Sequence, residues 1–310
     1  MKLAILDLGT NTFNMLIANV ESDKSYTILY KEELSVKLGE GGITKKTIAP
    51  LPFQRGIDAL KKHKSTTNTY RINVIRAFAT SAIRSAENGN DFVKKAFEET
   101  GINIQVIPGE EEAGFIYKGV KLAGLLDDNA SLIMDIGGGS TEFIIAYNKK
   151  LLWKQSFDLG AARLMQMFKP SNPITSAQIE ELQNYFDEIL IPLFDAVEQY
   201  PVTTLIGCSG SFESFANMIL HQSNMQEKLF AENYFNIELP DFSKLYYMLI
   251  NSSEAERYTI KGLIAMRVDT IVYASIFVDY IIKKLNIMHL QLSHYALKEG
   301  VLYDIIQGDK

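Results

Sequence analysis

Short apolar runs, separated by polar loops, open each half of the chain. In the first half they lie at residues 3–8, 15–20 and 26–30. In the second half an apolar run at 131–134 is followed by a glycine-rich loop and a second run at 142–147. Apolar runs of this length, bounded by turn residues, are typical of strands. The pattern therefore predicts a similar unit of strands in each half.

The two units align without a gap. A shift of 128 residues that carries Asp7 onto Asp135 also carries Gly9 onto Gly137, Thr12 onto Ser140, Asn14 onto Glu142 and Ala18 onto Ala146. Further along, Leu38-Gly39 takes the place of Leu159-Gly160. An internal duplication explains this match most simply, and a chance similarity of two hairpins is the alternative.

Strands and helices alternate along the rest of the chain. We expect strands at 71–80, 102–108, 204–207 and 289–293, and helices from about 81 to Gly101, from 109, at 176–200, at 242–250, at 264–284 and from 296. Pro192 should bend or divide the helix at 176–200. Alternation of this kind predicts an α/β layered fold. We place one domain at 1–125 and the other at 126–310, with the seam at 126–130.

Composition narrows the possible environments and partners. The single cysteine, Cys208, excludes an internal disulfide framework, and Asp7 interrupts the first apolar run too early for a secretory signal. The apolar run at 270–282 contains Asp279 and is too short to cross a bilayer. We therefore expect a cytoplasmic protein without a membrane contact. With 31 basic and 37 acidic residues the net charge is −6, so no DNA binding is expected and an anion must be bound locally.

The loop after residue 134 combines groups that suit phosphate and a divalent cation. Gly137, Gly138 and Gly139 leave the backbone N–H groups open to an anion, and Ser140 adds a hydroxyl group. Carboxylates flank this loop at Asp135 and Glu142. A glycine-rich hairpin turn is the alternative, although a two-residue turn needs neither three glycines nor two carboxylates.

Two other segments remain open on sequence grounds. Gly207, Ser209, Gly210 and Ser211 follow an expected strand and suit a second phosphate or hydroxyl group, but they equally suit a helix that begins at Ser211. The three glutamates at 110–112 open a helix, where acidic residues are favoured by the helix dipole. From the sequence alone, we interpret these glutamates as helix-capping residues.

The duplicated units resemble the actin-like (ribonuclease H-like) fold of actin, sugar kinases and heat-shock ATPases, whose ligand lies in a cleft between two domains. Within that group five segments resemble, in order, the signature of the exopolyphosphatase and guanosine pentaphosphate phosphohydrolase family. They read DLGTNTFNMLI, AFATSAIRSAENG, IPGEEEAGFIYKGV, DIGGGSTEF and DLGAARL. The C-terminal SHYALKEGVLYD departs from the family pattern at Ala296 and Lys298, and MRVDTIVYAS lacks glycines that often follow in the family.

The resemblance implies a role for each candidate residue. Glu112 would be the catalytic base, and Asp135 and Glu142 would hold Mg²⁺. Arg84 would contact a phosphate, as would the first loop, with Gly9, Thr10, Asn11 and Thr12. The implied activity is release of terminal phosphate from polyphosphate or guanosine pentaphosphate, between which the sequence does not choose. An ATP-dependent kinase and a non-catalytic nucleotide or alarmone sensor are the alternatives, and a homodimer is open.

Overall fold

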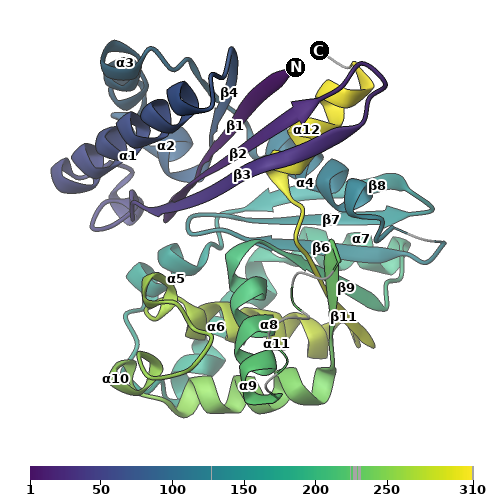
Figure 1. Ribbon diagram of the computed structural model, residues 1–310. Helices are drawn as coiled ribbons and strands as arrows, with labels where there is room; N and C mark the ends of the chain where they lie inside the picture. Colours follow the sequence, from purple (N-terminus) through teal and green to yellow (C-terminus); the bar gives the residue numbers. More distant parts are fainter. Residues whose placement is uncertain (127, 224, 226–228, 230–231, 309–310) are drawn as a thin grey trace.

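The computed structural model describes residues 1–126, 128–223, 225, 229 and 232–308 (Figure 1). The first sheet has the strand order β3-β2-β1-β4-β5, from β1 (Lys2–Leu8), β2 (Thr12–Val20), β3 (Tyr26–Ser35), β4 (Val74–Ala79) and β5 (Ile104–Val106). The second has the order β10-β11-β9-β6-β7-β8, from β6 (Ser131–Ile136), β7 (Thr141–Tyr147), β8 (Lys150–Phe157), β9 (Thr204–Cys208), β10 (Tyr234–Ile237) and β11 (His289–Ser293). Apart from β10, the two orders correspond strand for strand, which confirms the α/β fold of two similar units.

Register shows how closely the units correspond. Asp7 pairs with Asn14 across β1 and β2, and Asp135 pairs with Glu142 across β6 and β7. The pairing of the next two strands shifts at matching places, between Ile17 and Ala18 in one unit and between Ile145 and Ala146 in the other. All of these positions are related by the shift of 128 residues. The repeat seen in the sequence is therefore a repeat of backbone geometry.

The loops of the two units close in the same way. Gly9 N donates to Thr12 O at 3.0 Å, and Gly137 N donates to Ser140 O at 3.0 Å. The Leu-Gly pairs also match. A Cβ added at Gly39 would lie 2.6 Å from the Thr10 side chain, and one added at Gly160 would lie 2.3 Å from the backbone of Gly138. Glycine is thus required at both places because the loop lies directly against it.

Helices cover the outer faces of both sheets (Figure 1). In the first half they are η1 (Ile43–Lys45), α1 (Pro50–Thr69), α2 (Ser81–Ser85) and α3 (Gly89–Thr100). The helices of the second half are α5 (Ala161–Phe168), α6 (Ser176–Ile189), α7 (Ile191–Gln199), α8 (Ser209–Ser223), α9 (Leu239–Asn251), α10 (Glu254–Arg257), η3 (Ala265–Arg267) and α11 (Ile271–Lys284). Of these, α8 packs directly on β6, β9 and β11. Pro192 lies in the first turn of α7, which confirms the expected division. In the part of the chain that the structure describes, no helix has the length and apolar character needed to cross a bilayer.

Two helices connect the halves. The helix α4 (Gly109–Ala123) follows β5 of the first sheet but packs on β7 and β8 of the second. The helix α12 (Leu297–Gln307) follows β11 of the second sheet but packs on β1 and β2 of the first. They lie side by side between the sheets (Figure 1). Their apolar residues share one core with both sheets.

The crossing of α4 and α12 depends on reciprocal glycines. A Cβ at Gly119 would lie 2.1 Å from the Ala296 carbonyl oxygen, and one at Gly300 would lie 1.8 Å from the Phe115 carbonyl oxygen. Each half thus contributes a helix to the core of the other.

The domain division at 125/126 stays a prediction, and residue 127 of the expected seam lies outside the described residues.

Candidate active site

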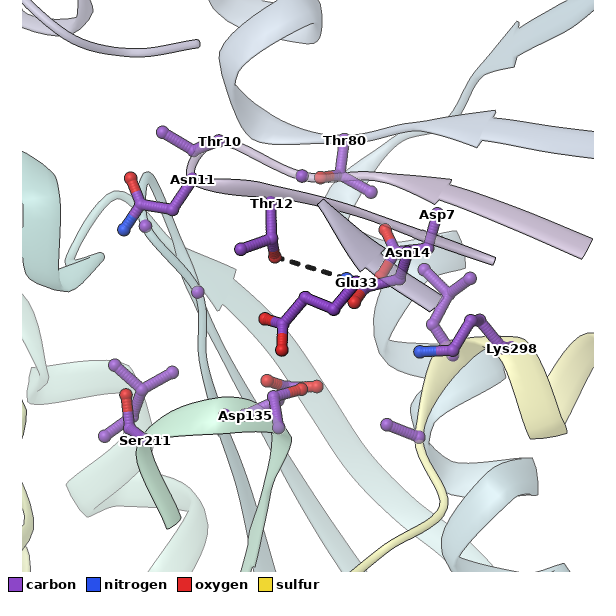
Figure 2. Close-up of a pocket in the computed structure, with 18 of the residues that line it drawn as sticks. Asp7, Thr10, Asn11, Thr12, Asn14, Glu33, Thr80, Asp135, Ser211 and Lys298 are labelled. Atoms are coloured by element: carbon purple, nitrogen blue, oxygen red, sulfur yellow. Dashed lines mark hydrogen bonds between the residues drawn. The ribbon is translucent and has the colours of Figure 1, made fainter. Parts of the chain in front are cut away.

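A polar cavity of about 390 Å³ lies between the two sheets and receives residues from both halves. The ends of β1 and β6 and the loops after them line it, together with the first turns of α4, α8 and α12. Figure 2 shows the carboxylates of Glu33 and Asp135 and the ammonium group of Lys298 directed toward its centre. The cavity therefore forms where the carboxyl ends of equivalent strands meet, as expected for a ligand site in this kind of fold.

The two glycine-bearing loops touch each other at this cavity. A Cβ at Gly138 would lie 2.8 Å from the Asn11 side chain, and one at Gly139 would lie 2.5 Å from Ser81 Oγ and 2.7 Å from Thr10 Oγ1. The glycines therefore allow the loops of the two halves to approach. The hydroxyl groups of Thr10 and Ser81 are buried and have no hydrogen-bond partner among the described residues, so they are available to a ligand.

Glu112 lies in the first turn of α4 and is 8% exposed. Arg84 Nη1 donates to Glu112 Oε2 at 2.9 Å and to the Ile107 carbonyl oxygen at 3.0 Å. Burial and the nearby charge of Glu142 raise the Glu112 pKa well above its ordinary value, although Arg84 opposes the shift. Its neighbour Glu110 is exposed. Helix capping would suit either carboxylate equally, whereas only Glu112 is held in the cavity.

Asp135 and Glu142 face each other across β6 and β7 and are 7% and 2% exposed. Burial raises the Asp135 pKa to about 6, against a hydrogen bond from Ser209. Burial and the charge of Asp135 raise the Glu142 pKa to about 7, against a hydrogen bond from Ser156 Oγ at 2.7 Å. Two ionised carboxylates at this depth need a compensating positive charge.

The balance of charge in the cavity favours a divalent cation. Asp7 adds a further carboxylate, which is partly buried. Loss of solvation raises the Asp7 pKa, and the charge of Lys298 opposes this shift most strongly. Burial alone would lower the Lys298 pKa, but Glu299 and Asp7 raise it, so Lys298 stays charged. The other lining cations, Lys31 and Arg267, pair with Glu299 and Glu33, so negative charge remains in excess where a phosphate would enter. Among the described residues no three metal-binding side chains gather in one group.

A third loop closes the cavity on the side of the second half. Ser209 has a positive φ of 65° at the end of β9, and it lines the cavity with Gly210 and Ser211. The Arg267 guanidinium packs on Gly210, where a Cβ would lie 1.8 Å from Nη2. Arg267 Nη2 also donates to Glu33 Oε1 of the first half at 2.7 Å. The glycine at 210 thus makes room for an arginine that reaches across the cleft.

Most of the expected site residues come together here. The lining contains Gly9, Thr10, Asn11, Thr12, Glu112, Asp135, Gly137, Gly138, Gly139, Ser140, Glu142, Ser209, Gly210 and Ser211. Two expected phosphate contacts lie outside it. Gly207 is within β9, where its missing side chain makes room for Phe212 only 1.9 Å from an added Cβ. Arg84 contacts Glu112 rather than the open space, so its phosphate contact stays a prediction.

Sequence reasoning missed several lining residues, among them Asp7, Glu33, Ser81, Arg267 and Lys298. Asp7 could have been found as the repeat counterpart of Asp135. Arg267 and Lys298 stand in segments that were noted only for their departures from a family pattern. Ser81 stands in the signature segment AFATSAIRSAENG, from which only Arg84 was selected. Glu33 carries no local signal, because tertiary structure alone brings it to the cavity.

Comparison with known proteins agrees with this geometry. Residues 16–308 match the model of the Ppx/GppA phosphatase family. An exopolyphosphatase from Cytophaga hutchinsonii is 37% identical, with a TM-score of 0.97 over 100% of this chain and 99% of that one. An Aquifex aeolicus member of the family is 21% identical, with a TM-score of 0.81 over 100% and 99% of the two chains, and shows a shared fold.

A longer curated protein is also related. A bifunctional 3-dehydroquinate synthase/phosphatase from Fusobacterium nucleatum is 33% identical over an alignment of 302 positions that covers 90% of this chain and 43% of that protein. The chain thus spans less than half of that relative. The family match and the near-complete structural match agree: this chain belongs to the Ppx/GppA phosphatase family.

Proposed function

We propose that the protein is a phosphohydrolase that releases terminal phosphate from inorganic polyphosphate, guanosine pentaphosphate or both. The observation that carries this proposal is the position of Glu112, a buried carboxylate directed into a cavity between two phosphate-type loops. Relatives named as an exopolyphosphatase and as a phosphatase support it. Both proposed substrates present the same terminal phosphoanhydride, so one site serves either.

In this mechanism the N–H and hydroxyl groups of the two loops hold the oxygens of the terminal phosphate. Arg84 holds one oxygen of Glu112, which leaves the other to accept a proton from water. The water oxygen then forms a bond to the terminal phosphorus, and the bond to the bridging oxygen breaks with its electron pair on the leaving phosphate. The raised pKa makes the ionised Glu112 carboxylate a stronger base toward the proton of the water.

Asp135 and Glu142 would hold Mg²⁺, directly or through water. A bound Mg²⁺ would neutralise phosphate charge and stabilise the charge that develops on the leaving group. Other side chains of the protein orient Glu142 and support the loop. Ser156 and Ser140 hydrogen-bond Glu142 and fix its orientation, while Arg163 donates from Nε to the Gly139 carbonyl oxygen at 2.8 Å and supports the loop.

A phosphate-release assay tests the proposal. Purified protein is incubated with Mg²⁺ and with polyphosphates of several lengths, guanosine pentaphosphate or ATP. Release of phosphate from polyphosphate or the guanosine nucleotide, abolished by chelation, is the expected result. Tight binding without release would indicate a sensor, and release of ADP only when a second acceptor is present would indicate a kinase. Either result would refute the hydrolase.

A further inference from the structure

A second cavity, of about 470 Å³, lies in the second half of the protein and shares no lining residue with the catalytic cavity. The end of α5, the segment after it, α10 and the start of α11 form its walls. In Figure 1 this is the region of α5 and α10, away from the two sheets. The proposed hydrolysis uses none of these residues.

Arg257 lines this cavity and is 6% exposed. Its Nε donates to the Val268 carbonyl oxygen at 3.1 Å, and its Nη1 donates to the Ser252 carbonyl oxygen at 2.6 Å and to Asn172 Oδ1 at 3.3 Å. All three acceptors are neutral. Nη2 has no hydrogen bond among the described residues, and none of their carboxylates is within ion-pair distance of Arg257. A buried guanidinium without a contacting anion is costly.

Two further donors face the same space. Tyr273 is 7% exposed, and within the described parts of the chain its hydroxyl group has no hydrogen-bond partner. Because burial raises the Tyr273 pKa, this hydroxyl stays protonated and remains a donor. Lys169 lines the rim, is exposed and forms no ion pair with any described residue. The cavity thus has three donor groups that lack an acceptor among the described residues: Nη2 of Arg257, the hydroxyl of Tyr273 and the ammonium group of Lys169.

The acidic groups at this cavity do not cancel its positive charge. Glu254 and Asp269 also line it. Asp269, however, already pairs with Lys37 of the first half, at 2.6 Å between Nζ and Oδ2. The Asp269–Lys37 pair has no net charge. Of the lining carboxylates, that of Glu254 is then left to balance Arg257 and Lys169. The cavity keeps about one net positive charge, together with a neutral hydroxyl donor.

We propose that this second cavity binds the phosphate group of a small anion. A guanidinium presents paired N–H donors that match phosphate oxygens, and an ammonium and a hydroxyl group can take the remaining ones. The phosphate group belongs either to free orthophosphate or to the end of a short polyphosphate. In both cases it lies outside the catalytic cavity, so the protein has two separate classes of phosphate site.

Equilibrium dialysis with radiolabelled orthophosphate tests the proposal on the full chain. The unaltered protein should show two classes of site. Tyr273→Phe removes one hydrogen bond to a charged ligand and should weaken one class about tenfold or more, and Lys169→Gln should weaken the same class. Matched controls are Tyr246→Phe, since Tyr246 is 4% exposed and lines neither cavity, and Lys244→Gln on the surface of α9.

Three outcomes would contradict the proposed phosphate site. A single class of site that Tyr273→Phe leaves unchanged, equal binding by the altered and control proteins, or an equal loss in the controls would each overturn the proposal. Thermal melting of each variant shows that it is folded. Displacement of the label by tripolyphosphate at lower concentration than by orthophosphate identifies a chain end as the occupant, and the reverse order identifies free phosphate. The second class should persist even if no substrate is hydrolysed.

Discussion

Glu112→Gln separates catalysis from binding at the proposed active site. The substitution keeps the shape of the side chain, and the amide oxygen can still accept the hydrogen bond from Arg84 at 2.9 Å. It removes only the ability to take a proton from water. Loss of a general base commonly lowers the rate by about a hundredfold to ten-thousandfold, which corresponds to about 3 to 5 kcal/mol of activation free energy.

The neighbouring glutamate supplies a matched control. Glu110 lies in the same first turn of α4 but is exposed and lines no part of the cavity. Each substitution removes one acidic charge from the helix start, worth about 0.3 to 1 kcal/mol. If Glu112 acts only as a helix cap, the two variants should lose similar stability and keep their activity.

Steady-state phosphate release and substrate binding should both be measured for Glu112→Gln and Glu110→Gln. We expect kcat to fall by the factor given above in Glu112→Gln, with the dissociation constant of the substrate little changed, and to stay unchanged in Glu110→Gln. Thermal stability of Glu112→Gln should not fall, because a neutral amide is easier to bury than a carboxylate. Near-full turnover of Glu112→Gln would refute its role as the base.

The remaining predictions concern the cation, pH and processivity. Asp135→Asn and Glu142→Gln should each raise the Mg²⁺ concentration for half-maximal activity; unchanged metal titrations would contradict their assignment. Because the Glu142 pKa is raised to about 7, the folded state holds a proton that the unfolded state has lost between about pH 4.5 and 7. The unfolding free energy without metal should therefore fall as pH rises through this window, by at most about 3 kcal/mol; denaturant titrations in which it rises or stays flat would contradict this. Long polyphosphate should shorten gradually on a gel, since the net charge of −6 gives no long-range attraction; loss of full-length polymer without intermediates would indicate processive attack.

The repeated hairpins could be predicted in detail because their signals are local. Strand, loop and returning strand lie within one continuous segment, so alternation of apolar and small residues fixes the register. The helix α1, in contrast, was not predicted from the sequence. Its buried face includes Gly56, His63 and Thr67, which do not read as an apolar stripe. Similarly, 264–284 was expected as one helix, but the structure has a short 3₁₀ turn followed by α11 from Ile271.

The candidate site was predictable only where one segment supplies several of its groups. The loops after β1 and β6 met that condition. Arg267 and Glu33 did not, since they are 234 residues apart in sequence and meet only in the fold. Arg84 contacts Glu112, which depends on a side-chain direction that no sequence pattern specifies, and its expected phosphate contact stays a prediction.

The exchange of α4 and α12 has a consequence for the origin of the protein. A half-length precursor of the duplicated unit would have carried its last helix away from its own sheet and left that sheet uncovered. Two copies could have covered each other by exchanging these helices, as α4 and α12 do here. The precursor would thus have folded only as a symmetric dimer that exchanged helices. Gene fusion would then have made the pairing permanent and let the two loops diverge until only the second carried both carboxylates.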